Sequence, residues 1–335
     1  MEVGDFELVR DLYGAVRNGN RPESYDRWRL LDNPVAPCPA ILAMDGERCC
    51  GLYLLWPTRL QLGREVVLGA QSVDTMTHPD YRNQGMFTAL ARDCLDLAAS
   101  RGFQALYGFP NPLSYPGFVR RLNWDHTGDV RHWVRFIRPS RLPRVPAVLG
   151  PVLDAVAKVL PRGGGRGVEV TCGRPDSETL ARFLAEWADR PELCRVSRDM
   201  EWLDWRYSPA SDMDYEWLVA WRGGQPIACG VWGMRGAGWG DQADGRAKVM
   251  ETFGADSAGL SAVIAAAIAS ATAKGAWLIE TLTNLEPVTG LLMRAGFVSH
   301  RKAPFIVRGL TCRTLGGNIH THSVWRIVGG DIDTF

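Results

Sequence analysis

Hydrophobic and polar positions alternate between two periods along the first half of the chain. In 86–99 the apolar residues recur at helical spacing and form a single face, which predicts an amphipathic helix. Other runs are short and rich in β-branched and aromatic residues, and they predict strands at 40–44, 49–56, 66–76, 104–109 and 130–137. Strands interleaved with helices in this way predict a mixed α/β layer fold.

A segment rich in proline and glycine divides the chain. Five prolines lie between residues 139 and 161, and three consecutive glycines follow at 163–165. This is turn and linker chemistry, in which only 148–160 has the pattern of a short amphipathic helix. We therefore place a linker at 138–166. At about 150 residues per domain, a chain of 335 residues is also long enough for two domains.

The two halves repeat one another in sequence. Residues 101–106 correspond to 274–279 at an offset of 173, and the register holds from Asn123-Trp124 to Gly296-Phe297. Upstream, two further matches follow in order with offsets of 177 and 179, namely 28–29 with 205–206 and 51–53 with 230–232. Ordered matches of this kind indicate an internal duplication.

Composition excludes several classes of protein. Lys and Arg total 38 against 37 Asp and Glu, so no basic excess is present to neutralise nucleic acid. No apolar run approaches the roughly 18 residues of a membrane span, and the first residues lack the features of a secretory signal. The eight cysteines contain no C-x-x-C pair, which favours reduced thiols over disulfides or a zinc site. We expect a cytoplasmic protein with no metal, nucleic-acid or membrane partner.

The segment 74–88 carries the most informative chemistry. A predicted strand stops at Pro79, and a turn then opens directly into the predicted helix. Amides at a helix start are unpaired and can bind a phosphate. Gly85 would let the backbone approach such a ligand, and Arg82 would add positive charge. As a pattern alone R-x-x-G is common, and an ordinary turn capped by Asn83 is the alternative.

The context of this turn resembles the acyl-coenzyme A (acyl-CoA) binding core of the GNAT superfamily of N-acyltransferases. After the turn come the amphipathic helix, a strand that leads to Asn111, a short helix and Asn123-Trp124. The resemblance covers most of 5–137 and, more faintly, 167–309. It implies that acetyl-CoA or another acyl-CoA is a substrate, with its pantetheine between parted strands at 73–77 and 104–109.

The resemblance also implies which residues contact acyl-CoA. They are Met76, Thr77, Arg82, Asn83, Gln84, Gly85, Met86, Phe87, Thr88 and Asn111. Phe87 departs from the family pattern, because Gly or Ala is more frequent at that position, but its backbone amide remains available.

The second half lacks this chemistry. At the offset of 173, Ala255 and Ala258 stand in place of Arg82 and Gly85, and Asp256 would repel a pyrophosphate. Asp256 or Ser257 instead suits a helix N-cap. We therefore expect a tandem of two GNAT-like mixed-sheet α/β domains, the second degenerate. The predicted boundaries are 1–137 for the acyl-CoA domain, 138–166 for the linker, 167–309 for the degenerate domain and 310–335 for a tail.

Acyl transfer to an amine requires a base for the amine and a proton for the leaving thiolate. The base position of the family falls near Gln71, which cannot serve, and Asp74 is the nearest carboxylate. Because a strand alternates faces, Asp74 reaches the same side only through a bulge. The acid tyrosine of the family falls on Val119; Tyr115, one turn earlier, is the candidate acid, and a packed surface tyrosine is the alternative.

The end of the chain suggests where the acceptor binds. Residues 325–335 surround Asp331 and Asp333 with apolar side chains and resemble the C-terminal signature of tandem GNAT proteins that act on nucleotide-linked amino sugars. We expect this tail to return to the cleft between the halves and to contact the acceptor. Glu251 and Glu280, on strands of the second half, are further candidate acceptor contacts.

These expectations favour an N-acyltransferase that acts on the amine of a small polar molecule, foremost an amino sugar. An aminoglycoside, a polyamine or a protein amine is the alternative acceptor. A non-catalytic CoA-binding sensor is the alternative outside enzymes, since the usual base and acid positions hold Gln71 and Val119. The sequence gives no indication of the oligomeric state.

Overall fold

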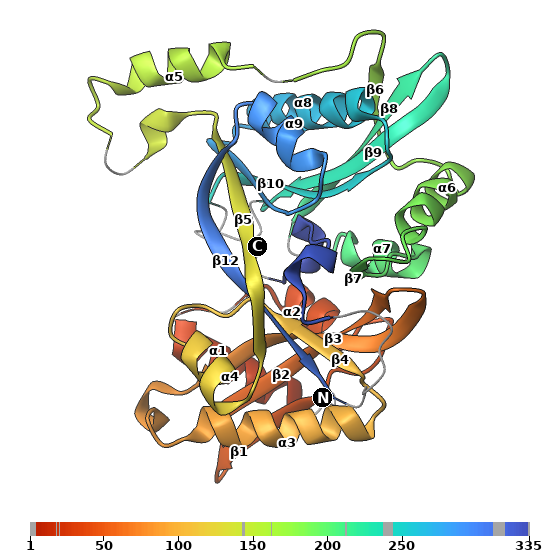
Figure 1. Ribbon diagram of the computed structural model, residues 1–335. Helices are drawn as coiled ribbons and strands as arrows, with labels where there is room; N and C mark the ends of the chain where they lie inside the picture. The colour runs from red at the N-terminus through yellow and green to blue at the C-terminus, as the bar shows by residue number, and fades with distance from the viewer. Residues whose placement is uncertain are drawn as a thin grey trace. The chain divides into compact units, whose positions relative to one another are not determined.

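A computed structural model describes residues 5–17, 19, 21–142, 145–161, 163–211, 213–236, 244–310 and 319–333. The chain forms two compact units of mixed α/β structure (Figure 1). Unit 1 comprises Met1–Asp129, Arg190–Ser211 and Ala303–Trp325, and unit 2 comprises Val130–Asp189, Asp212–Lys302 and Arg326–Phe335. The predicted fold class is confirmed, whereas the units depart from the predicted boundaries at 137 and 309.

Unit 1 is built on a mixed sheet with the strand order β1-β2-β3-β4-β12, and β7 pairs with the far end of β2. Its strands are β1 (Ala40–Asp45), β2 (Arg48–Leu62), β3 (Glu65–Thr77), β4 (Ala105–Gly108), β7 (Cys194–Val196) and the second part of β12 (Val298–Gly309). Its helices are α1 (Phe6–Arg17), α2 (Glu23–Leu30), η2 (Pro79–Tyr81), α3 (Met86–Ser100), α4 (Tyr115–Arg121), α7 (Met200–Arg206) and η5 (His322–Val324).

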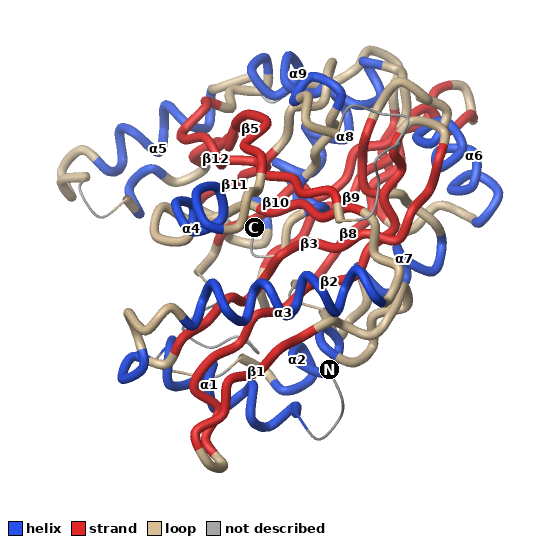
Figure 2. Tube along the Cα trace, turned by 60° about the horizontal axis from the view of Figure 1, so that its bottom comes forward, coloured by secondary structure: helices blue, strands red, loops and turns tan. Residues whose placement is uncertain are grey.

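The core of unit 1 forms where α3 covers the sheet. Helix α3 lies across one face of the strands, as Figure 2 shows, and it buries one stripe of its residues there: Leu90, Ala91, Cys94, Leu95 and Ala98. These positions recur at i, i+1, i+4, i+5 and i+8, which is one side of an α-helix. The amphipathic helix predicted at 86–99 is therefore confirmed.

Unit 2 has the strand order β5-β11-β10-β9-β8-β6. Its strands are β5 (Asp125–Phe136) from Val130 onward, β6 (Glu169–Cys172), β8 (Asp214–Arg222), β9 (Gln225–Met234), β10 (Arg246–Phe253) and β11 (Leu278–Leu282). Its helices are η3 (Pro139–Arg141), α5 (Gly150–Val159), α6 (Ser177–Ala188), α8 (Ser257–Ala273), α9 (Val288–Arg294) and η6 (Gly329–Asp331). Helix α8 fills the place that α3 has in unit 1 and packs on the sheet with Trp133, Ala247 and Ile279 in the core.

The closing strand of each half completes the sheet of the other unit. Residues of β5 pair antiparallel with β11, from Leu278 opposite Phe136 to Leu282 opposite His132. Residues of β12 pair antiparallel with β4, from Ile306 opposite Gly108 to Gly309 opposite Ala105. The boundaries of the compact units differ from the predicted ones for this reason, since a strand's hydrophobic pattern does not specify its pairing partner.

The internal repeat is visible in unit 1 as a reciprocal contact between α2 and α7. The Nε1 of Trp28 donates to the carbonyl of Trp205 at 2.7 Å, and the Nε1 of Trp205 donates to the carbonyl of Trp28 at 3.2 Å. The two rings stack with centroids 5.0 Å apart. Residues matched by sequence at the offset of 177 are therefore also matched in their contacts.

Among the described residues, no helix is both long and apolar enough to cross a membrane. The described part of the chain also contains no group of three or more His, Cys, Asp or Glu side chains placed to hold a metal ion.

Candidate functional site

The turn between β3 and α3 is held by contacts on its first half. His78 Nδ1 accepts from the amide of Asp80 at 3.3 Å, and His78 Nε2 lies 2.6 Å from an Arg48 guanidinium nitrogen. Tyr81 Oη donates to Asp45 at 2.5 Å. Buried His78 therefore shapes the turn.

The second half of the turn presents an open helix N-terminus. Gly85 is the N-cap of α3 with φ of 78°, and no side chain caps the helix there. Arg82, Asn83, Gln84 and Gly85 are all exposed, and a Cβ built on Gly85 would meet no atom within 4 Å. The Thr88 amide already donates to the carbonyl of Gly85 at 3.0 Å, so it is less available than the sequence suggested. The first amides of α3, the partial positive end of its dipole and Arg82 together suit an anion.

Strands β3 and β4 part beside this N-terminus. Their parallel pairing runs from Gly69 opposite Ala105 to Ser72 opposite Gly108 and then ends. Strand β3 continues to Thr77, paired there only with β2. Its residues 73–77, which include Met76 and Thr77, therefore leave the edge that faced β4 without a β4 partner. An extended ligand with amide groups can use such an edge.

Asp74 lies at a bulge in β3. The register between β2 and β3 shifts between Leu52 and Leu54, and Asp74 has a φ of 41°. The carboxylate is buried and lies 3.1 Å from a guanidinium nitrogen of Arg29 and 3.4 Å from one of Arg21. Burial alone would raise the pKa of Asp74, but these two arginines outweigh it and lower the pKa. A carboxylate with a lowered pKa and two cationic partners is a weak proton acceptor at neutral pH.

Tyr115, the first residue of α4, belongs to a chain of polar side chains. Its Oη lies 3.0 Å from His126 Nδ1, and His126 Nε2 lies 3.1 Å from Asp129 Oδ1. The tyrosine and histidine rings meet edge to face, with centroids 5.4 Å apart. His126 and Asp129 are each about one third exposed, so the chain is open to solvent. Tyrosine, imidazole and carboxylate in this order can move a proton toward the tyrosine oxygen.

Asn111 starts the loop that leads into α4. Its Oδ1 accepts from the amides of Leu113 and Ser114 at 2.9 and 3.0 Å. The oxygen thus holds the turn before α4, and the side-chain NH₂ group is the part of Asn111 that is left for a ligand.

Comparison with known proteins identifies this part of the chain. The family model of the acetyltransferase (GNAT) domain matches residues 1–127. These residues form a GNAT domain. The resemblance inferred from 74–88 is thereby confirmed for this range, which contains the turn, the parted strands and Tyr115. A comparison with curated protein sequences finds no match.

Solved structures extend the likeness in fold to the whole chain. A conserved protein of unknown function from Enterococcus faecalis V583, described as a probable N-acyltransferase, has a TM-score of 0.64 at 13% identity, covering 94% of this chain and 72% of its own. A GCN5-related N-acetyltransferase from Anabaena variabilis ATCC 29413 has a TM-score of 0.64 at 9% identity, covering 92% and 71%. A tandem GNAT protein from the clavulanic acid biosynthesis pathway has a TM-score of 0.61 at 12% identity, covering 92% and 96%. The predicted tandem GNAT fold is therefore confirmed.

Unit 2 has no counterpart of the open turn in the GNAT domain. Three residues separate β10 from α8, whereas eight separate β3 from α3. Asp256 caps α8 by accepting from the amide of Gly259 at 2.8 Å, and Arg222 pairs with the same carboxylate at 2.7 Å. The N-cap role expected for Asp256 is confirmed. A carboxylate thus occupies the place where an anion would bind.

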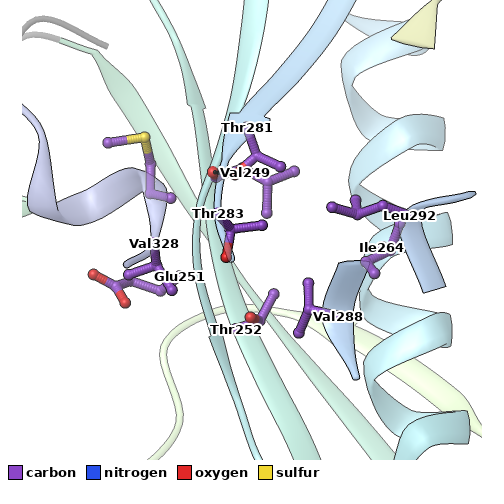
Figure 3. A pocket seen from close by; sticks show the side chains of 10 residues that line it. Val249, Glu251, Thr252, Ile264, Thr281, Thr283, Val288, Leu292 and Val328 are labelled. Atoms are coloured by element: carbon purple, nitrogen blue, oxygen red, sulfur yellow. Dashed lines mark hydrogen bonds between the residues drawn. The ribbon is translucent and has the colours of Figure 1, made fainter. Parts of the chain in front are cut away.

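The parted strands of unit 2 are filled by side chains and by the tail. Strands β10 and β11 pair only from Arg246 opposite Leu278 to Lys248 opposite Glu280. Beyond that point lies a cavity of about 10 Å³, room for about one water molecule. Figure 3 shows Ile264, Val288 and Leu292 closing one side of the strands, with Val328 of the tail on the other side. A pantetheine chain does not fit this space.

Hydrogen bonds fix the tail to the two residues that follow β11 in unit 2. Thr283 Oγ1 donates to the carbonyl of Ile327 at 2.7 Å, and the amide of Ile327 donates to Asn284 Oδ1 at 2.8 Å. Asn284 is the repeat counterpart of Asn111 at the offset of 173. In unit 2 the tail thus bonds to Asn284, whose counterpart in the GNAT domain, Asn111, is predicted to bind the pantetheine.

The four acidic residues predicted to contact an acceptor are buried in unit 2. Glu280 Oε2 lies 2.5 Å from Arg246 and 2.9 Å from His132 Nε2. Burial would raise the pKa of Glu280, but the His132 contact and the charges of Arg246 and Lys248 lower it to about 2. Asp331 Oδ2 accepts from the amide of Val328 at 2.9 Å and so closes the 3₁₀ turn of the tail. Glu251 and Asp333 are also buried.

Two sets of contacts were not predicted from the sequence. Arg21 and Arg29, which bind Asp74, lie about 50 residues before it in the sequence. The only sequence pattern that includes Arg29 is the Trp-Arg pair repeated at 205–206. The ring of His126 joins Tyr115 to Asp129. Its place three residues before an aspartate was the available hint.

Proposed function

We propose that the chain is an acyl-CoA-dependent N-acyltransferase, and that the GNAT domain of unit 1 holds the acyl-CoA. The observation that carries this proposal is the pairing of two features at one place. An uncapped helix N-terminus, with Gly85 in the left-handed region, follows β3. The last residues of β3 are not paired with β4. The first suits a pyrophosphate and the second suits a pantetheine.

Acyl-CoA is a substrate here, and the residues that would hold it are those of the open turn and the free strand edge. Arg82 and the amides of 83–87 suit the pyrophosphate, Met76 and Thr77 offer the strand edge, and the Asn111 NH₂ group suits a pantetheine carbonyl. The amide of Thr88 is already bonded to the carbonyl of Gly85, so Thr88 adds no further amide donor to the open turn.

We assign the proton for the leaving thiolate to Tyr115. Its Oη is connected through His126 to Asp129, so a proton given up by the tyrosine can be replaced from the imidazole. Asp74 is ion-paired with Arg29 and Arg21, and this geometry favours a role in fixing α2 to β3 over direct proton abstraction. In this proposal the acceptor amine loses its proton to water or to a side chain other than Asp74.

The acceptor in this proposal is the amine of a small polar molecule, with an amino sugar, free or nucleotide-linked, as the first to test. Support comes from the short likeness of 325–335 to tandem GNAT proteins that act on such sugars. A net charge of +1 gives no reason to expect a polycationic acceptor, which an acidic cleft would attract. Aminoglycosides, polyamines and protein amines are the alternatives.

The test is release of free thiol from acetyl-CoA by the pure protein over a panel of amines, read with a thiol reagent. We expect turnover with an amino sugar that exceeds hydrolysis without acceptor. Turnover only with an aminoglycoside, polyamine or peptide amine would keep the acyltransferase and replace the acceptor. Tight binding of acetyl-CoA with no thiol release from any amine would support the non-catalytic sensor, for which Gln71 and Val119 at the usual catalytic positions argue.

A further inference from the structure

Helix α5 of unit 2 exposes its apolar residues to solvent. Its apolar stripe recurs at helical spacing from just before the helix to just after it, and the members are exposed by 37 to 81%: Val148, Leu149, Val152, Leu153, Val156, Val159 and Leu160. By contrast Gly150 and Ala157 are the buried residues of α5. A surface helix of a globular protein normally shows the opposite arrangement.

The side of α5 that faces the protein contains Asp154 beside the buried Gly150 and Ala157. Asp154 accepts from the amide of Ser140 at 2.9 Å and from its hydroxyl at 2.7 Å, which fastens the helix to η3. Asp154, Ala157 and Lys158 line a recess of unit 2 together with Arg135 of β5 and Ile137, which follows the strand. In both views α5 stands apart from α8 and α9 (Figures 1 and 2). The hydrogen bonds between Asp154 and Ser140 therefore hold the helix with its apolar stripe facing outward.

Positive charge is concentrated around this stripe. The segment 138–166 contains six of the chain's 38 Lys and Arg residues and only one of its 37 Asp and Glu residues. Four of the six are described and exposed: Arg138, Arg141, Lys158 and Arg166. The rest of the chain is consequently net acidic. An anionic surface would attract this segment and repel the remainder, which fixes an orientation as well as a contact.

We propose that α5 and its basic flanks form a docking surface for an anionic lipid bilayer, with the helix lying in the interface. Exposed valine and leucine side chains would enter the boundary between headgroups and acyl chains, while the arginines and Lys158 contact lipid phosphates. A helix of ten residues is too short to span, in keeping with the absence of a spanning helix among the described residues. The sequence prediction of no membrane partner rested on that point and did not address surface binding.

A second copy of the chain is the competing occupant, and charge argues against it. Two copies that met through α5 would bring two sets of basic flanks together with a single acidic residue on each, Asp154, already bound to Ser140. Like charges at a contact repel, whereas anionic headgroups neutralise them.

The experiment is flotation of the full chain with vesicles of phosphatidylcholine alone or with phosphatidylglycerol added. We expect binding to the anionic vesicles at low salt, little to the neutral ones, and release as salt rises. The double substitution Val152→Ser with Val156→Ser should weaken binding at least about tenfold, because each removes an apolar side chain from the interface. Replacing Arg138 and Arg141 by Gln should also weaken it.

The matched control is Val66→Ser with Val298→Ser, two valines exposed by 57 and 55% on β3 and β12, which should bind as the wild type does. Light scattering on the same samples reports the oligomeric state. Wild-type protein that ignores anionic vesicles overturns the proposal. A dimer that the α5 substitutions dissociate, without vesicle binding, assigns the stripe to a second copy instead.

Discussion

Gly85 has a backbone conformation that a side chain resists and a position that a ligand needs. Its φ of 78° strains any residue with a Cβ, and the space above it is empty of protein. We expect Gly85→Val to weaken acetyl-CoA binding at least about a hundredfold, because a branched side chain would stand where the phosphates approach. Isothermal titration checks this, and wild type should bind one acetyl-CoA per chain.

Gly102 supplies the matched control at the other end of α3. Its φ is 84°, and a Cβ there also meets nothing within 4 Å. Gly102→Val should therefore bring a similar backbone strain with normal acetyl-CoA affinity. If both variants lost affinity equally, the effect of Gly85 would be strain and not the anion site.

Asp74 is buried between two arginines, one of which, Arg29, has no exposed surface. Asp74→Asn removes the charge and leaves Arg29 and Arg21 facing a neutral amide. Breaking a buried ion pair destabilises a protein by about 3 to 5 kcal/mol. We expect a marked fall in melting temperature, with kcat of the folded protein lowered less than tenfold. A variant of normal stability whose kcat falls by roughly 10² to 10⁴ would instead make Asp74 the base.

Tyr115 and His126 give separable effects if they act in one proton path. Tyr115→Phe should lower kcat about a hundredfold while acetyl-CoA affinity is kept, because only the hydroxyl is lost. His126→Gln keeps a hydrogen-bonding group but removes the imidazole from the proton path, so it should lower kcat less than Tyr115→Phe does. A kcat equal to that of wild type in both variants would show that Tyr115 is a packed surface residue.

At the scale of elements, the tail depends on one close approach. A Cβ on Gly329 would lie 2.5 Å from the carbonyl oxygen of Val249 and 3.2 Å from Met250 Cα, both on the backbone of β10. Gly329→Ala should therefore displace η6 and destabilise the protein by about 1 to 3 kcal/mol. If the tail holds the acceptor, kcat/KM for the amine also falls while acetyl-CoA affinity stays.

The control for this change lies in α9 of the same unit. A Cβ on Gly290 would meet only Arg294 Nη2, at 3.9 Å, so Gly290→Ala should leave both stability and turnover at or above the wild-type level. Deleting residues 329–335 should reproduce the loss of amine turnover seen with Gly329→Ala. An equally active deletion variant would reduce the tail to packing.

Elements with a local pattern could be predicted, and contacts distant in sequence could not. The apolar residues of 86–99 keep one helical period, and this pattern predicted α3. The position of Asp256 directly before α8 predicted its N-cap role. The bulge at Asp74 was stated only as a condition. The arginines that bind Asp74 come from α2 and the residues before it, and nothing in the periodicity of β3 indicates them.

At the scale of the whole molecule, pairing was the part that the sequence did not specify. Strands β5 and β12 have ordinary strand composition, and each could have closed the sheet of its own half. Their partners β11 and β4 lie more than 140 and 190 residues away in the sequence. The choice depends on long-range packing, which periodicity within one strand does not encode.

Acid stability tests the buried charges of unit 2. The pKa of Glu280 falls from the ordinary value of 4.5 to about 2 in the folded state. The folded state therefore stabilises the ionised carboxylate relative to the protonated acid. A lowered folded pKa means that the stabilisation is fully present above about pH 4.5 and is lost as the pH falls toward 2. Its size is on the order of 3 kcal/mol. Glu280→Gln removes the titrating group, so urea midpoints of the variant should lie below wild type at pH 7.

That difference should shrink steadily as the pH falls below 4.5, because wild type then protonates Glu280 and comes to resemble the variant. Glu169→Gln, at an exposed position on β6 of the same unit, is the control and should follow the wild-type curve throughout. Asp74 also loses its ion pairs in acid, but it does so in both proteins, and the comparison of variant with wild type cancels its contribution. A gap between wild type and Glu280→Gln that stays constant down to pH 3 would mean that the contacts of Glu280 with Arg246 and His132 do not depend on its charge.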